Sequence, residues 1–186
     1  CAQLDAFRAS ADNKGVVAAW NQHYKIIQLA NDLIDNAGRT QTSATERNIA
    51  LGQAHFWRAY AYFYLVRIFG PLPISLHSES DGGKTQLTDV EGVYKLIVDD
   101  LTKADELNLP TAYKGEPRNM FGCDVYVTQQ AVKSTLAAVY MAMAGYPLNK
   151  GQEYYAKAAD AAEAVIKGVE NGTYNHNMDP EWKNVY

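Results

Sequence analysis

The sequence has 186 residues, with 17 Lys and Arg against 21 Asp and Glu and a formal net charge of −4. With 47% hydrophobic and 20% charged residues, it has the composition of an ordinary globular domain, which excludes collagen-like and largely disordered chains. The mild acidity argues against nucleic acid as a partner, because sequence-independent binding needs a basic face to neutralise phosphates. No apolar run reaches the roughly 20 residues that span a bilayer.

Cysteine and aromatic usage add two further points. Cys1 and Cys123 are too few for a disulfide framework. Tyrosine is over-used, with 13 residues beside 3 Trp and 5 Phe. An apolar ring with a polar tip packs well between helices and also binds sugars and peptides, so the count leaves both uses open.

Helical periodicity predicts a first helix from about residue 16 to 36. Its apolar face recurs at steps of three and four residues. The face comprises Trp20, Tyr24, Ile27, Asn31 and Ile34. We expect Asn31, as a polar residue on this face, to hydrogen-bond to a neighbouring helix or loop rather than to bind a ligand.

The second predicted helix starts after Ser43, which forms a capping box with Glu46. It extends to Phe69, where Gly70 and Pro71 end it. Its apolar positions cover so much of the circumference that we expect a central helix.

The third predicted helix follows a polar loop at 75–87 and a second capping box, Thr88 to Glu91. A further loop covers 111–124. Thr128 is the expected N-cap of a fourth helix, which runs to about Ala144.

A fifth helix is expected from about Gln152 to Gly168, followed by an irregular tail. Strand signals are weak, and only Leu72 to Leu76 suggests a short extended piece.

These elements predict an all-α fold of tetratricopeptide-like helical hairpins, an α-α superhelix with long loops, forming a single domain over 1–186. The aromatic anchors Trp20, Tyr94 and Tyr155 lie farther apart than the roughly 34 residues of a plain repeat. The fifth helix has no partner helix in the sequence, so we expect the chain to belong to a longer protein.

Several motifs follow one another in order along residues 16 to 174. They are Trp20-x-x-x-Tyr24, Arg58-Ala59-Tyr60, Phe69-Gly70-x-x-Pro73, Val93-Tyr94-x-x-Ile97-x-x-Asp100-Leu101 and Leu136-Ala137-x-Val139-Tyr140. In this order they resemble the SusD/RagB family of surface glycan-binding lipoproteins. Two features depart from the family: Tyr126 and Val127, rather than Gly-Arg, precede the fourth helix, and family members are considerably longer.

The resemblance implies a non-catalytic protein, without cofactor, that captures glycan for import through a TonB-dependent, SusC-like transporter. It also implies location at the outer-membrane surface, with a lipid anchor as the chain's link to the membrane. Cys1 could carry that anchor, although an ordinary internal cysteine is the preferred interpretation. A peptide ligand, or a helical-repeat scaffold for protein–protein interaction, remains an alternative.

Sugar binding needs an exposed aromatic ring on which the apolar face of a pyranose can stack, and loops expose rings better than helix cores do. The candidate ligand-binding residues are therefore Trp20, at a helix start, and Tyr113, Phe121 and Tyr126, in the long loop. For each of them a structural role is the competing interpretation.

Arg58 lies on the inward stripe of the central helix, where an unpaired charge would be costly. Asp100 is its expected partner in a structural ion pair, because it neighbours the inward-facing Leu101.

No catalytic or metal-binding motif is evident. Gly82-Gly83-Lys84-Thr85 lacks the spacing and flanking elements of a phosphate-binding loop. The four histidines, His23, His55, His77 and His176, form no metal-ligand pair, and we expect them on the surface or in packing roles. An all-helical glycosidase would need two carboxylates about 5–10 Å apart, and nothing in the sequence argues for such a pair.

Overall fold

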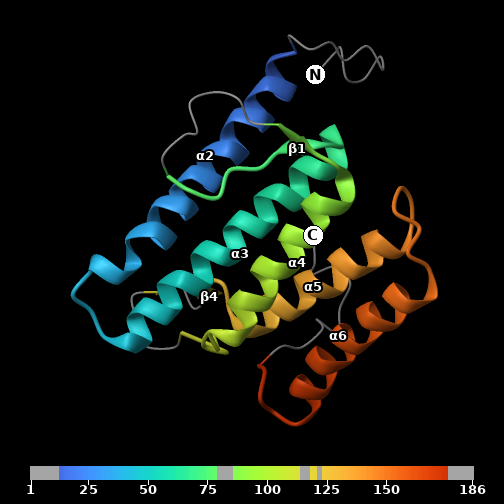
Figure 1. Cartoon of the computed structure of the whole chain (residues 1–186). Coiled ribbons are helices and arrows are strands. Elements are labelled where there is room, and N and C mark those ends of the chain that lie inside the picture. The colour runs from blue at the N-terminus through green and yellow to red at the C-terminus, as the bar shows by residue number, and fades with distance from the viewer. Residues whose placement is uncertain (1–12, 79–85, 114–117, 121–122, 176–186) are drawn as a thin grey trace. The chain divides into compact units, whose positions relative to one another are not determined.

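A computed structural model describes residues 13–78, 86–113, 118–120 and 123–175, and these are mainly helical (Figure 1). The five α-helices in this part of the chain confirm the predicted all-α fold. They are α2 (Lys14–Asn36), α3 (Ala44–Phe69), α4 (Val90–Glu106), α5 (Gln129–Ala144) and α6 (Gln152–Glu170). A short 3₁₀ turn, Ala37–Arg39, follows α2.

The contacts group the chain into two compact units, 1–107 and 108–186, and each unit is described by itself. The expectation of one domain stays a prediction. Among the described residues, no helix is sufficiently long and apolar to cross a membrane.

Helices α2, α3 and α4 each begin where a side chain accepts from a backbone N–H group of the first turn. Asn13 caps α2, accepting from the amides of Gly15 and Val16. Ser43 caps α3 as predicted, with 3.1 Å between its Oγ and the amide nitrogen of Glu46. The predicted cap of α4 is one residue off, because Asp89 rather than Thr88 caps this helix; its carboxylate accepts from Gly92 N at 2.8 Å. A carboxylate at this position also interacts favourably with the helix dipole.

Thr128 stands at the N-cap of α5 as predicted, but its side chain makes no capping hydrogen bond. The last helix, α6, extends two residues past the predicted end at Gly168.

The chain after α6 folds back onto the helix at Gly168. The Tyr174 ring packs directly against the Gly168 backbone, where any Cβ would collide with the ring. The chain turns back at this point because the amide of Tyr174 donates to the carbonyl of Gly168 at 2.8 Å.

In the first unit, α3 packs against α2 on one side and against α4 on the other, as the ribbon shows (Figure 1). This position confirms that α3 is the central helix. Its buried positions cover most of its circumference and include charged and polar residues as well as aliphatic ones. The largest fully buried apolar side chains of this unit are Ile27, Tyr62, Leu65, Leu72, Val93, Ile97 and Leu101.

The chain between α3 and α4 carries the extended segment that the sequence suggested at 72–76. Only β1 (Leu72–Pro73) is a strand, and it pairs antiparallel with β2 (Leu87–Thr88). The segment that follows, residues 74–78, lies along α2 and α3 and is held there by side chains described below.

The second unit consists of the α5–α6 hairpin and the loop before it. Small residues on α6, such as the buried Ala158, let the two helices pack closely. Two short strands precede α5, namely β3 (Asn119–Met120) and β4 (Cys123–Asp124), which pair antiparallel. This two-residue ladder was not predicted, because so short a strand shows no alternation in sequence.

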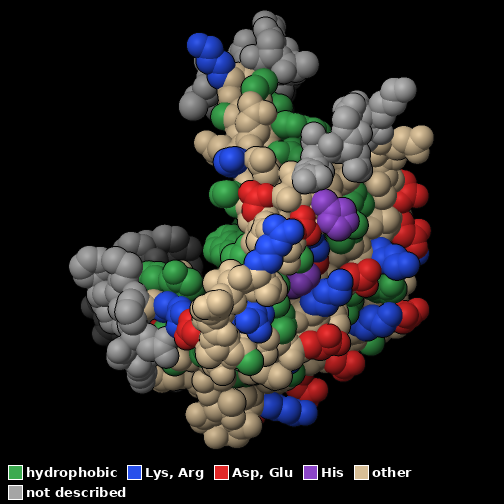
Figure 2. All heavy atoms as spheres, turned by 60° about the vertical axis from the view of Figure 1, so that its left-hand side comes forward, with side chains coloured by type: hydrophobic (Ala, Val, Ile, Leu, Met, Phe, Trp, Pro, Cys, Tyr) green, Lys and Arg blue, Asp and Glu red, His purple; other side chains and the backbone are tan. Residues whose placement is uncertain are grey.

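Acidic and basic side chains lie interspersed on the face of the molecule shown in Figure 2. No single-sign patch dominates that face. This distribution agrees with the mild net charge of −4, and the described residues form no broad basic surface for a polyanion on that face.

Candidate functional site

Trp20 lies in the second turn of α2 and is part of an aromatic cluster. Its ring centroid is 4.7 Å from that of Tyr24 and 5.0 Å from that of Phe69, which it meets edge to face. The indole is partly exposed. Trp20 therefore makes aromatic contacts within the first unit and is only partly exposed.

The loop aromatics differ from one another in exposure. Tyr113 is fully buried, and its hydroxyl donates to the carbonyl of Val127 at 2.9 Å. The expectation that Tyr113 presents an exposed ring is therefore wrong: its hydroxyl finds a backbone acceptor inside the unit, which makes burial of the ring favourable. Tyr126 is 45% exposed. Phe121 falls outside the described residues.

Tyr126 has an aromatic and a cationic neighbour. The Tyr113 ring centroid lies 5.9 Å away, and the Arg118 guanidinium lies 5.6 Å from the centre of the Tyr126 ring. The backbone holds this arrangement, since the amide of Tyr113 donates to Asp124 and that of Val125 to the carbonyl of Arg118. A half-exposed aromatic ring beside a guanidinium group can offer a ligand both an apolar face and N–H hydrogen-bond donors.

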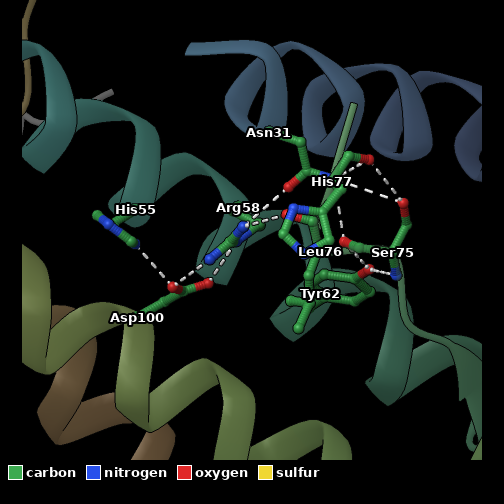
Figure 3. Close-up of polar contacts among 8 residues, drawn as sticks. All are labelled: Asn31, His55, Arg58, Tyr62, Ser75, Leu76, His77 and Asp100. Carbon is green, nitrogen blue, oxygen red and sulfur yellow. Dashed lines mark hydrogen bonds and ion pairs between the residues drawn. The ribbon is translucent and has the colours of Figure 1, made fainter. Parts of the chain in front are cut away.

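A buried polar network connects all three helices of the first unit (Figure 3). Its centre is Arg58 on α3, which donates through Nε and Nη2 to both carboxylate oxygens of Asp100 on α4, each at 2.8 Å. The third contact runs from Arg58 Nη1 to the side-chain oxygen of Asn31 on α2, also at 2.8 Å. The ion pair between Arg58 and Asp100 that the sequence predicts is thus present. Its bidentate geometry is the strongest form of an arginine–carboxylate pair.

His55 is a further member of this network, which the sequence did not predict. Its Nδ1 donates to Asp100 Oδ1 at 2.8 Å, and its side chain is only 11% exposed. The expectation of a surface or packing histidine is therefore incomplete, because His55 is buried and paired. The available signal was its position three residues before Arg58, which places both side chains on one face of α3.

The same network fixes the chain at residues 75–77. Asn31 Nδ2 donates to the carbonyls of Ser75 and His77, at 3.1 and 3.2 Å. The Tyr62 hydroxyl accepts from the amide of Ser75 at 2.8 Å and also contacts its carbonyl. Side chains of α2 and α3 thus take over the backbone hydrogen bonds that secondary structure would otherwise make here.

A second, exposed contact holds the end of this segment. Asp35 on α2 accepts from the amide of Ser78 at 2.8 Å and lies 3.2 Å from His77 Nδ1. These two donors hold the pKa of the Asp35 carboxyl below its ordinary value. The connection after β1 is therefore anchored at both its buried and its exposed face.

Burial changes the acidity of two groups in the network. Desolvation raises the pKa of the Tyr62 hydroxyl to about 12. Burial also pushes the pKa of Asp100 upward, but the hydrogen bonds and charges of Arg58 and His55 outweigh it and hold that pKa below 3.8. Asp100 is accordingly an anion in the folded protein at neutral pH.

We predict that acid weakens the fold through Asp100. Because its pKa is lower in the folded chain than in the unfolded one, its contribution to stability is complete above pH 3.8 and is lost as the pH falls below that value. The free energy of unfolding, measured by urea titration from about pH 7 to about pH 2.5, should fall more steeply below pH 4 in the wild type than in Asp100→Asn. Asp99→Asn, at the exposed neighbouring position, should keep the wild-type slope; equal slopes in all three proteins would contradict the prediction.

The comparisons with known proteins agree with this fold. The model of a SusD-like family, described as "starch-binding associating with outer membrane", matches residues 3–141. The chain belongs to this SusD-like family. The resemblance drawn from the ordered motifs is thereby confirmed. Among the described residues of this SusD-like chain, no group of three or more His, Cys, Asp or Glu is placed to hold a metal ion.

Relatives of this SusD-like chain match it along most of its length. SusD-like protein P2 of Formosa agariphila is 30% identical over 187 residues, which is 99% of this chain and 33% of that protein. The crystal structure of a SusD superfamily protein from Parabacteroides distasonis matches with a TM-score of 0.77 at 30% identity, covering 89% of this chain and 34% of that one. A crystal structure with a xylogluco-oligosaccharide has the same fold, with a TM-score of 0.81 at 24% identity over 99% of this chain and 35% of that one. The chain thus spans about a third of the length of these relatives.

Proposed function

We propose that this chain is the helical-repeat part of a protein that binds glycan at the outer-membrane surface and passes it to a TonB-dependent, SusC-like transporter. The observation that carries the proposal is the family match over residues 3–141, since that family is described by starch binding and by association with the outer membrane. On this proposal the protein binds its glycan without cleaving it. A lipid anchor would hold it at the surface.

An oligosaccharide is favoured over a peptide as the ligand. A solved structure with the same fold holds a xylogluco-oligosaccharide. In this chain the half-exposed Tyr126 ring, with the Arg118 guanidinium beside it, supplies an apolar face and N–H donors next to each other. A pyranose needs both, because its ring faces are apolar and its edge carries hydroxyls.

Among the four candidate residues, the geometry supports Tyr126 most directly. Its ring is accessible, whereas the buried Tyr113 contacts it from behind and would act by holding it in place. Trp20 is partly exposed in the other unit and remains a candidate there. Phe121, one of the sequence candidates, retains its proposed role in the same loop.

We expect Tyr126→Ala to weaken oligosaccharide binding about tenfold, which corresponds to the roughly 1.4 kcal/mol of a moderate contact residue. The measurement is isothermal titration of malto-oligosaccharide and xylogluco-oligosaccharide into the complete gene product. Tyr155→Ala is the matched control, because Tyr155 is 43% exposed, much as Tyr126 is, but lies on helix α6 rather than in the loop that carries the proposed site, so its loss should not affect affinity. Equal affinities in the two variants would contradict the assignment of Tyr126.

A further inference from the structure

The loop before α5 places a cation beside an accessible aromatic ring. The Arg118 guanidinium lies 5.6 Å from the centre of the Tyr126 ring, within the distance at which a cation and a π-face attract each other. Tyr126 is 45% exposed, and Arg118 is partly exposed. A ligand that stacks on the open part of the Tyr126 ring therefore comes within reach of a positive charge.

The surrounding backbone fixes where the cation and the ring stand. The carbonyl of Arg118 accepts from the amide of Val125 at 3.1 Å, and strands β3 and β4 pair within the turn that this bond closes. The Tyr126 ring, one residue further along, packs against the fully buried Tyr113 ring. Because both partners are positioned before a ligand arrives, less ordering has to accompany binding.

A guanidinium distinguishes acidic sugars from neutral ones. Its planar N–H fork matches a carboxylate with two parallel hydrogen bonds, and such charge-assisted bonds are about twice as strong as those to neutral hydroxyls. In a uronic acid the carboxylate stands on the edge of the pyranose, while the ring faces stay apolar. When one of those faces stacks on an aromatic ring, the edge groups point sideways, toward the neighbours of that ring.

The charge balance favours a ligand with few acidic groups. The net charge of −4 repels a polyanion. The same loop also carries Asp124, whose carboxylate accepts from the amide of Tyr113 at 3.0 Å. Arg118 therefore suits an isolated acidic unit in an otherwise neutral oligosaccharide better than a chain of uronates.

We propose that Arg118 is a specificity-determining residue that selects glycans carrying a uronic acid, with the carboxylate paired to Arg118 while the sugar ring stacks on Tyr126. This role rests on the proposed glycan binding and adds to it the chemical class of the sugar. Neutral oligosaccharides use the same ring and bind more weakly.

The test compares two ligands that differ only in charge. The complete gene product is titrated calorimetrically with a xylo-oligosaccharide that carries a single glucuronic acid branch, and with the methyl ester of the same compound. The wild type should bind the acid about tenfold more tightly than the ester, because the ester has lost its charge and one acceptor oxygen of the pair. Arg118→Gln should lower the affinity for the acid to that for the ester and leave the ester almost unaffected.

Two further variants make the comparison specific. Arg118→Lys keeps the charge without the fork, so part of the preference for the acid should remain. Arg39→Gln removes an exposed arginine of the first unit and should leave both affinities unchanged. Circular dichroism verifies that each variant is folded. Should Arg118→Gln fail to fold, Arg118→Lys decides, and an undiminished preference in that variant would overturn the role of the fork.

Failure of this role and failure of glycan binding give different results. If the wild type binds acid and ester equally, or the ester more tightly, Arg118 does not select a uronic acid, although the protein still binds glycan. A preference for the acid that survives in Arg118→Gln would likewise overturn the assignment to Arg118. If the acid, the ester and the malto- and xylogluco-oligosaccharides all fail to bind, the proposed glycan binding is wrong, and this role with it.

Discussion

Replacing Arg58 by leucine should lower the free energy of unfolding by about 3–5 kcal/mol, the range measured when one partner of a buried ion pair is removed. Asp100 is only 1% exposed, so without Arg58 its carboxylate would keep His55 as its remaining side-chain donor. The side-chain oxygen of Asn31 would also lose its charged partner. Urea unfolding followed by circular dichroism measures the loss directly.

Two further variants separate the ion pair from general effects of the substitution. Arg39→Leu changes the same residue type at an exposed position, so the free energy of unfolding should stay within error of the wild type. In the double variant Arg58→Leu/Asp100→Leu, no buried charge is left alone, so the loss should be clearly smaller than the sum of the two single losses. A loss below about 1 kcal/mol in Arg58→Leu, as for a surface pair, would show that the network does not hold the fold together.

Replacing Asn31 by alanine should cost about 2–3 kcal/mol, because it removes the acceptor of the buried Arg58 Nη1 and the amide donor of two backbone carbonyls, each of which keeps one hydroxyl donor. Asn31 is fully buried, and its amide donates to Ser75 and His77 while its oxygen accepts from Arg58. The segment 75–77 should therefore loosen from α2 as well. Urea unfolding gives the free energy, and amide hydrogen exchange at Ser75, whose N–H donates to Tyr62, reports the local loosening.

Asn36→Ala is the matched control on the same helix. Asn36 is exposed and bonds locally to Asp32 and Arg39, so its loss should change neither the free energy of unfolding nor the exchange at Ser75. Faster exchange at Ser75 in both variants would indicate that the segment is held by something other than Asn31. If Ser75 in Asn31→Ala exchanges at the wild-type rate, Tyr62 alone suffices to hold the segment 75–77 in place.

The helices could be predicted from the sequence because their signals are local. Periodic apolar positions and the Ser43 cap define α3, and Gly70 ends it with a positive φ of 73° that glycine adopts without strain. The one-residue error at the start of α4 arose because Thr88 and Asp89 are both good caps, and only the backbone geometry decides between them.

The polar network could be predicted only in part. A charge on the inward face of α3 requires a partner, so the sequence indicated the pair of Arg58 with Asp100. His55 lies one turn before Arg58 on the same face of α3, so this spacing could have indicated it as a second partner of Asp100. The carbonyls that Asn31 holds depend on how a non-helical segment folds back over two helices, which no periodicity encodes. Burial of Tyr113 was missed for the same reason, since the acceptor for its hydroxyl is a backbone carbonyl in the same loop.

The most direct test of the account is a saturation titration of the complete gene product with the malto- and xylogluco-oligosaccharides, followed by tryptophan fluorescence and by chromatography of the sugars. The account predicts saturable binding and sugars recovered intact. Cleaved sugars would contradict the assignment as a binding protein. An absence of binding to every oligosaccharide, together with binding of peptides, would contradict glycan as the ligand of this SusD-like protein.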